Sequence, residues 1–279
     1  MAQRIVTLTT DFGVTDHYVG AMKGVILGVN PDARIVDICN SVQSYDVLDG
    51  AITISQCYRN YPSDTIHMVV VDPGVGTARR PIVATTERHI FLAPDNGVLS
   101  LVYEQEERLS VRHITSDHFF QSPVSNTFHG RDIFASVAGW MSKGVEAIKL
   151  GEEITDFVKF AAPKPKAISD TQTKGIVIRV DKFGNLVTNL RPDDVPALFQ
   201  EPTPAFTLVV GKAQVTKLRT SYSQAGPGEL FAILGSMGFV EISANRAPAA
   251  ALAAVNKGAE VNISFGGAAA APPPAAPAQ

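Results

Sequence analysis

Residues 66–83 of the chain read IHMVVVDPGVGTARRPIV. The apolar run from Ile66 to Val71 is mostly β-branched and does not alternate with polar residues, a pattern that predicts a strand buried on both faces of a parallel sheet. The run stops at Asp72, and the Pro73-Gly74 pair that follows predicts an irregular turn. Because ligands of open α/β sheets bind beyond the carboxyl ends of the strands, Asp72 stands where chemistry is expected.

Upstream of this stretch, apolar runs alternate with helical patterns. A short strand is expected from Ile5 to Thr9, and it leads into Asp11, which is thus the same kind of strand-end residue as Asp72. Helical periodicity follows after Asp16 and again after Asp46. Further strands are expected at residues 35–38, 82–85 and 89–92. This order predicts that residues 1–160 form an α/β domain with a mainly parallel sheet covered on both faces.

The pattern changes in the second half of the chain. Residues 161–173 are rich in Pro, Lys and Ala and lack apolar periodicity, which predicts an interdomain linker. Residues 174–265 contain short strand patterns separated by turn residues, typical of a smaller all-β barrel or sandwich. Residues 266–279 are Gly, Ala, Pro and one Gln, so a disordered tail is expected.

Composition excludes several classes of function. With 18% charged residues and a net charge of -3, the chain offers no basic face for nucleic acid or an anionic membrane. Its two cysteines, Cys39 and Cys57, are too few for a disulfide scaffold and show no metal-ligand spacing. The N-terminus has no signal-peptide pattern, and no apolar window approaches the ~20 residues of a membrane span. A cytoplasmic protein without a metal is expected.

Several loops carry polar side chains suited to chemistry. Arg79 follows Asp72 closely enough to fold back onto its carboxylate, and His129 precedes a helix whose dipole disfavours a charged imidazolium. In the second half, residues 181–189 form a predicted turn that contains an acid, Asp181, an aromatic residue and two amides. In residues 235–239, Ser236 lies between two glycines. Each of these features alone is also typical of an ordinary ion pair, a helix cap or a hairpin connection.

Taken together and in order, these loops resemble one family. The motifs are Thr10-Asp11-Phe12-Gly13, Asp72-Pro73-Gly74-Val75-Gly76, Ala93-Pro94-Asp95-Asn96-Gly97, Thr127-Phe128-His129-Gly130-Arg131-Asp132, residues 181–189, and Gly235-Ser236. With them the chain resembles, over roughly residues 4–265, the S-adenosyl-L-methionine hydroxide adenosyltransferases, which are relatives of the fluorinating and chlorinating enzymes.

The resemblance implies hydrolysis of S-adenosyl-L-methionine to adenosine and L-methionine, with no cofactor beyond the substrate. It implies an Asp-Arg-His triad around the attacking water, which falls on Asp72, Arg79 and His129. It also implies a homotrimer with active sites between subunits. The substrate contacts that it implies are Asp11 for the ribose hydroxyls, Asp181 for the ammonium, Asn185 for adenine, Tyr45 and Tyr222 as flanking aromatics, and Ser236 for the carboxylate. Met237 departs from the pattern, because the halogenating relatives carry Arg there.

Hydrolysis of a sulfonium substrate is reasonable on physical grounds, and three alternative functions predict different residues at the site. The sulfonium makes methionine a neutral leaving group, so the protein must chiefly align a water, with Asp72 or His129 accepting its proton. A halogenase would use a Ser where this chain has Gly130, and Asp72 would repel a halide. A non-catalytic S-adenosyl-L-methionine or nucleoside binding protein would not need the triad. A metal-dependent hydrolase would need a cluster of metal ligands, and the sequence shows no His/Asp cluster with the required spacing.

Overall fold

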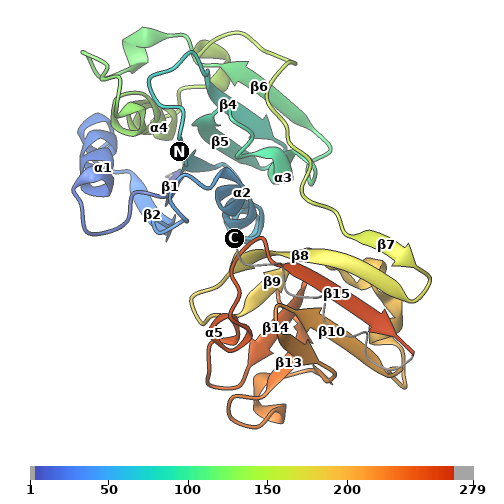
Figure 1. Cartoon of the computed structure of the whole chain (residues 1–279). Coiled ribbons are helices and arrows are strands. Elements are labelled where there is room, and N and C mark those ends of the chain that lie inside the picture. The colour runs from blue at the N-terminus through green and yellow to red at the C-terminus, as the bar shows by residue number, and fades with distance from the viewer. Residues whose placement is uncertain (1–3, 267–279) are drawn as a thin grey trace, which may run out of the picture. The chain divides into compact units, whose positions relative to one another are not determined.

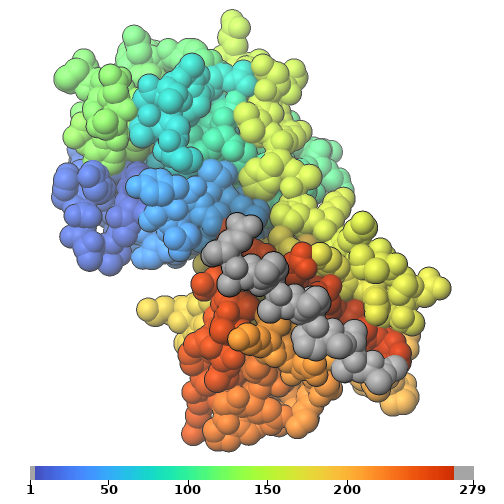
Figure 2. Space-filling model, in the orientation of Figure 1, coloured from blue at the N-terminus to red at the C-terminus, as the bar shows by residue number. Residues whose placement is uncertain are grey.

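The computed structural model describes residues 4–266, and the contacts within it define two units that divide between Ala162 and Pro163. Figure 1 shows their helices and strands, and in Figure 2 each unit is a continuous packed body. The predicted tail, apart from Gly266, lies outside the described residues. The predicted linker contains regular structure, because its residues 166–169 form a strand of the second unit.

The first unit is a six-stranded sheet with helices on it (Figure 1). Its elements are β1 (Ile5–Thr10), α1 (Tyr18–Val29), β2 (Arg34–Cys39), α2 (Val47–Ser55), β3 (Thr65–Val70), β4 (Pro81–Thr86), β5 (His89–Pro94), α3 (Ser100–Tyr103), β6 (Leu109–His113), a π-helix (Gly130–Ala135) and α4 (Ser136–Ser142). Three 3₁₀ turns join them at Tyr58–Asn60, Asp117–Phe119 and Ala147–Lys149.

The sheet is mixed rather than mainly parallel. In the strand order β2-β1-β3-β5-β4-β6, the pairs from β2 to β5 are parallel, whereas β4 pairs with both of its neighbours in the antiparallel sense. The reason is the short connection at Glu87-Arg88 between β4 and β5, because a parallel crossover needs a dozen residues or more.

The central strand β3 is buried on both faces, as its sequence predicts. Ile66, Met68 and Val70 join a hydrophobic cluster with α1 and α4, while Val69 and Val71 join another with α2. Burying the full strand fixes its position in the sheet, and its carboxyl end therefore presents Asp72 at a defined place. Helix α2 begins as expected, with the Asp46 carboxylate accepting a hydrogen bond from the Asp49 backbone amide at 3.0 Å.

The second unit is mainly β and contains one nine-stranded sheet. Its elements are β7 (Lys166–Ser169), β8 (Gln172–Val180), β9 (Leu186–Thr188), β10 (Phe206–Val210), β11 (Ala213–Val215), β12 (Leu218–Arg219), β13 (Leu230–Leu234), β14 (Val240–Ala244), α5 (Ala249–Ala253) and β15 (Glu260–Phe265). Three 3₁₀ turns lie at Pro192–Asp194, Pro196–Phe199 and Tyr222–Gln224.

The prediction of an all-β barrel or sandwich needs correction in two respects. Helix α5 is part of the unit, and the strand order β11-β10-β15-β8-β9-β14-β13-β12 is an open path whose end strands do not pair with each other in residues 4–266. All neighbours along this path are antiparallel except β12 and β13.

Within the described part of the chain, no helix is long and apolar enough to cross a membrane.

Candidate active site

The loop that follows β3 brings Asp72 and Arg79 together. Arg79 Nε lies 3.1 Å from Asp72 Oδ1 and 2.9 Å from Oδ2, and Arg79 Nη2 lies 2.5 Å from Oδ2. The two side chains are 9% and 4% exposed, so this is a buried, bidentate ion pair rather than an ordinary surface one. Phe134 packs under the guanidinium, with its ring centroid 5.6 Å from Cζ.

His129 completes the group from a distant part of the chain. Arg79 Nη2 lies 2.6 Å from His129 Nδ1. A guanidinium can only donate, so Nδ1 accepts and the proton of the neutral ring is on Nε2. Burial lowers the pKa of His129, and the positive charge of Arg79 lowers it further, against the opposing effect of Asp72 and Asp132. The imidazole is therefore neutral near pH 7 with an N–H donor on its far side.

One guanidinium nitrogen is left for a ligand. Arg79 Nη1 is buried and has no hydrogen-bond partner among residues 4–266. Because an unpaired buried donor is costly, this nitrogen marks a place for an incoming oxygen. The three side chains predicted as a triad thus form one connected group with an acceptor, Asp72, and two available N–H donors.

Close backbone packing holds the loop in place. Gly76 adopts φ 77°, and a Cβ at that position would lie 2.2 Å from the Asn126 carbonyl oxygen. The loop after β3 therefore rests on the segment that leads to His129. Asn96 fixes the base of the loop by donating to the Val71 carbonyl oxygen at 2.9 Å. The Ala93–Gly97 motif is thus structural, since Asp95 is likewise engaged by Arg80 at 2.7 Å.

Asp11 and Tyr45 lie together at the end of the neighbouring strand β1. The Tyr45 backbone amide donates to Asp11 Oδ2 at 2.8 Å, and Tyr45 adopts the left-handed φ of 64°. A non-glycine residue in this region is strained and persists only when its surroundings hold it. The Asp11 contact supplies such support and leaves the Tyr45 side chain 76% exposed.

In the second unit, Asp181 and Asn185 form one closed turn. Asp181 Oδ1 accepts from the backbone amides of Phe183 and Asn185, and Oδ2 accepts from the Asn185 side chain, each at 2.8 Å. Asn185 is buried with the turn. One of the two N–H donors of its side-chain amide is therefore already used in holding the Asp181 carboxylate.

The remaining predicted residues of this unit lie in two further loops. Tyr222 begins a 3₁₀ turn, and burial raises its pKa, with Glu241 and Asp181 raising it further. Ser236 is exposed in the turn from Gly235 to Phe239, which a hydrogen bond of 2.9 Å from the Gly238 amide to the Gly235 carbonyl oxygen closes.

Two residues near these loops were not predicted from the sequence. Glu241 influences the pKa of Tyr222 although it lies inside strand β14. Arg191 stacks on Phe239, with Cζ 4.1 Å from the ring centroid, and brings a positive charge to the turn that contains Met237. A single acid in the apolar run 239–244 is the signal that could have revealed Glu241.

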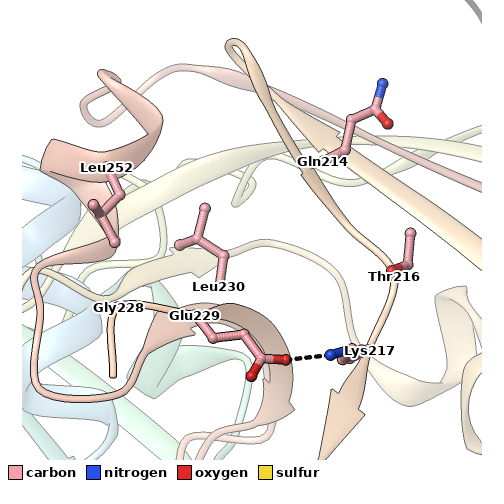
Figure 3. A pocket seen from close by; sticks show the side chains of 7 residues that line it. All are labelled: Gln214, Thr216, Lys217, Gly228, Glu229, Leu230 and Leu252. Atoms are coloured by element: carbon pink, nitrogen blue, oxygen red, sulfur yellow. Dashed lines mark hydrogen bonds and ion pairs between the residues drawn. The ribbon is translucent and has the colours of Figure 1, made fainter. Parts of the chain in front are cut away.

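A hollow of about 430 Å³ lies elsewhere on the second unit, and Figure 3 shows its lining. Leu230 and Leu252 form its apolar part, and Lys217 pairs with Glu229 at 2.7 Å. None of the predicted site residues lines it. Among residues 4–266 there is also no group of three or more His, Cys, Asp or Glu side chains that could hold a metal ion.

Comparison with known proteins gives a consistent match. Residues 6–151 match the family model described as the SAM hydroxide adenosyltransferase N-terminal domain, and residues 175–262 match that of the C-terminal domain. The chain is 33% identical to a protein of Methanocaldococcus jannaschii named (R)-S-adenosyl-L-methionine hydrolase, over 86% of this chain and 88% of the relative. It is 27% identical to a Fluorinase of Nocardia brasiliensis, over 94% of this chain and 97% of the relative.

A solved structure agrees with these matches. It is that of an uncharacterized conserved protein from Thermotoga maritima, with a TM-score of 0.85 and 34% identity, and the similarity covers 93% of this chain and 99% of that one. The likeness therefore extends over both units of the chain.

Proposed function

Because the chain belongs to the SAM hydroxide adenosyltransferase family, we propose that it hydrolyses S-adenosyl-L-methionine to adenosine and L-methionine. The observation that carries this proposal is the connected group of Asp72, Arg79 and His129, which contains one proton acceptor and two N–H donors that are not used within the group. The names of relatives at about 30% identity over most of the chain support the same activity.

The proposed reaction is a displacement at the ribose 5′ carbon. The oxygen of a water forms a bond to this carbon while the carbon–sulfur bond breaks, and the electron pair of that bond returns to sulfur. Methionine therefore leaves as a neutral thioether, and the water proton must pass to the protein. Alignment of the attacking oxygen can account for on the order of 7–11 kcal/mol of the barrier at best. No cofactor is part of this proposal, because the sulfonium already supplies the leaving group.

Asp72 is the proposed proton acceptor. His129 Nδ1 is occupied by Arg79, and its Nε2 carries the proton, so the neutral imidazole donates to the attacking oxygen rather than accepting from it. Arg79 Nη1 is the second donor and stabilises developing hydroxide character. The Arg79 charge also weakens Asp72 as a base, and placing both donors on the oxygen offsets this effect by making the water more acidic.

Substrate binding is proposed to use the loops of both units. In the first unit, Asp11 holds the ribose hydroxyls beside Tyr45. In the second unit, Asp181 and Ser236 hold the ammonium and carboxylate of the methionine part, and Asn185 and Tyr222 lie against the adenine. The support for these roles is their position in the family motifs and, for Asp11 and Asp181, the hydrogen bonds that fix each carboxylate.

Halogenation is disfavoured by the surroundings of Gly130. A Cβ at this position would lie 3.0 Å from Met22 Sδ and 3.2 Å from the Phe12 ring, so the serine of a halide site would fit here only if these side chains shifted. The buried Asp72 carboxylate would also repel a halide. A hydrolase is therefore favoured over a halogenase, although Fluorinases are among the relatives.

Assembly and location are also part of the proposal. We propose a homotrimer in which the active site combines the first unit of one subunit with the second unit of its neighbour. A cytoplasmic location is supported by Cys39 and Cys57, both of which are free thiols. Light scattering tests the assembly: a trimer that loses activity as it dissociates on dilution is expected, whereas a fully active monomer would contradict it.

The function itself is tested by incubating the purified protein with S-adenosyl-L-methionine and separating the products by chromatography. Adenosine and methionine in equal amounts are expected. The names of the relatives specify the (R) form, so the two sulfonium epimers are presented separately. Binding with recovery of intact substrate would instead identify a binding protein.

A further inference from the structure

Strand β14 carries a buried carboxylate without a partner. Its residues Val240, Ile242 and Ala244 belong to the hydrophobic cluster of the second unit, so the alternation of the strand places Glu241 and Ser243 on the opposite face. Glu241 is 6% exposed, and no hydrogen bond or ion pair reaches its carboxylate from the described residues.

Such a carboxylate is costly in the free protein. An isolated buried charge loses its hydration, and proteins normally pair it or neutralise it. Burial raises the pKa of Glu241, and the neighbouring Asp181 raises it further. Such an acid is either neutral in the free protein or paired with a cation, and a cationic ligand at this place supplies the pairing that the described residues do not.

The neighbours of Glu241 identify the place of that ligand. Asp181 is close enough to raise the pKa of Glu241, and Glu241 is close enough to raise the pKa of the Tyr222 hydroxyl. A Cβ at Gly235 would lie 1.9 Å from Glu241 Oε1, so the carboxylate rests directly on the backbone at the start of the Ser236 turn. Glu241 thus joins the three loops to which the proposed function assigns the methionine part and the adenine of the substrate.

Asp181 alone does not provide all the hydrogen-bond acceptors that a primary ammonium needs. Its oxygens already accept three hydrogen bonds that hold the turn from Asp181 to Asn185. A primary ammonium has three N–H donors and needs several acceptors when water is excluded. Glu241 has both of its oxygens available for this purpose in residues 4–266.

We propose that Glu241 binds the α-ammonium of the methionine part of the substrate, with Asp181 as the second negative charge beside it. The inference rests on the proposed function, because that function supplies the amino-acid end of the ligand. A charge-assisted contact of this kind corresponds to a roughly ten- to hundredfold difference in affinity.

The test is the substitution Glu241→Gln, which keeps the shape of the side chain and removes its charge. The matched control is Glu260→Gln, which neutralises an exposed carboxylate on β15. The probes are L-methionine, its analogue lacking the amino group, and adenosine. The parent is expected to prefer methionine over the analogue. Glu241→Gln should lower methionine affinity and raise KM roughly ten- to hundredfold, while analogue and adenosine binding stay within about twofold of the parent.

A second variant guards against a folding defect. Gly235→Ala places a methyl group against Glu241 Oε1 and should displace the carboxylate, with the same loss of preference for methionine. If folded Glu241→Gln distinguished methionine from the analogue as the parent does, the inference would be wrong while hydrolysis stood. If the parent failed to hydrolyse S-adenosyl-L-methionine yet preferred methionine, only the proposed function would fail.

Discussion

Arg79 and His129 are joined by a hydrogen bond of 2.6 Å from Nη2 to Nδ1, and the direction of this bond determines the tautomer of the imidazole. The ring proton is on Nε2, so His129 presents a donor to the substrate side. The same guanidinium also donates hydrogen bonds to the Asp72 carboxylate. This arrangement assigns the two roles toward the attacking water: Asp72 accepts its proton, and His129 donates a hydrogen bond to its oxygen.

Asp72→Asn should abolish most of the catalysis and spare binding. The amide keeps the size of the side chain but accepts a proton far less readily, and loss of a positioned acceptor costs on the order of 10²–10⁴ in rate. Single-turnover kinetics with titration of adenosine would separate the two effects. Asp37→Asn, which removes an exposed carboxylate paired with Lys23, is the control and should leave kcat unchanged. Parental turnover by Asp72→Asn would remove Asp72 from the mechanism.

The activity should fall on the acid side as His129 gains a proton. Burial and Arg79 lower the pKa of His129 below the ordinary 6.5, so the neutral donor form persists through pH 7 and is lost only at lower pH. The pH profile of kcat should therefore show an acid limb with its midpoint below 6.5. In His129→Gln, whose amide can still accept from Arg79, the contribution of the imidazole to this limb should vanish. A midpoint above 6.5 in the parent would mean that the site favours the imidazolium.

Gly76→Ala should disrupt the site through the backbone alone. The added Cβ meets the Asn126 carbonyl oxygen at 2.2 Å, and the residue needs a positive φ, so the loop must move. Strain of order 1–3 kcal/mol and a rate loss above about tenfold are expected. Gly228→Ala is the matched control, because this glycine also has a positive φ, of 72°, but its Cβ would meet nothing within 4 Å. Melting temperature and kcat of both variants measure the difference, and equal behaviour would contradict the role given to Gly76.

The first unit should lose stability in acid through a buried histidine pair. Thr7 Oγ1 lies 2.8 Å from His67 Nδ1, and His67 Nε2 lies 3.4 Å from His89 Nδ1. Burial lowers the pKa of His67 to about 3, with a smaller effect from His89. The unfolded chain therefore binds more protons below pH 6.5, and stability falls as the pH drops from there toward 3.

Between pH 7 and pH 5 this histidine alone should reduce the free energy of unfolding by about 2 kcal/mol. Urea titrations at both pH values measure the change. His67→Gln should reduce the change in the free energy of unfolding between the two pH values by that amount. His118→Gln, which removes an exposed imidazole, should leave this change as it is in the parent. An unchanged slope in His67→Gln would show that other groups cause the acid sensitivity.

The sequence predicted the parts of the fold that depend on local patterns. The unbroken apolar run of β3 gave a doubly buried strand, and Asp46 gave the start of α2. The apolar patterns do not reveal the antiparallel half of the first sheet, which follows instead from the link at Glu87-Arg88, because this link is too short for a parallel crossover.

The site was predictable only in part. Asp72 and Arg79 are close in sequence, but His129 reaches them through the packing of the Gly76 loop on Asn126, which no spacing rule contains. The resemblance supplied that residue. Neither spacing nor resemblance gave the tautomer of His129, which depends on one hydrogen bond, or the isolation of Glu241, which depends on strand register.

The most direct measurement is hydrolysis in water enriched in ¹⁸O, with mass analysis of both products. If an activated water attacks the ribose 5′ carbon, one ¹⁸O should appear in adenosine and none in methionine. Asp72→Asn should lower the rate of this incorporation and Asp37→Asn should not. Unlabelled adenosine, label in the amino-acid product, or release of methylthioadenosine in place of adenosine would contradict the account.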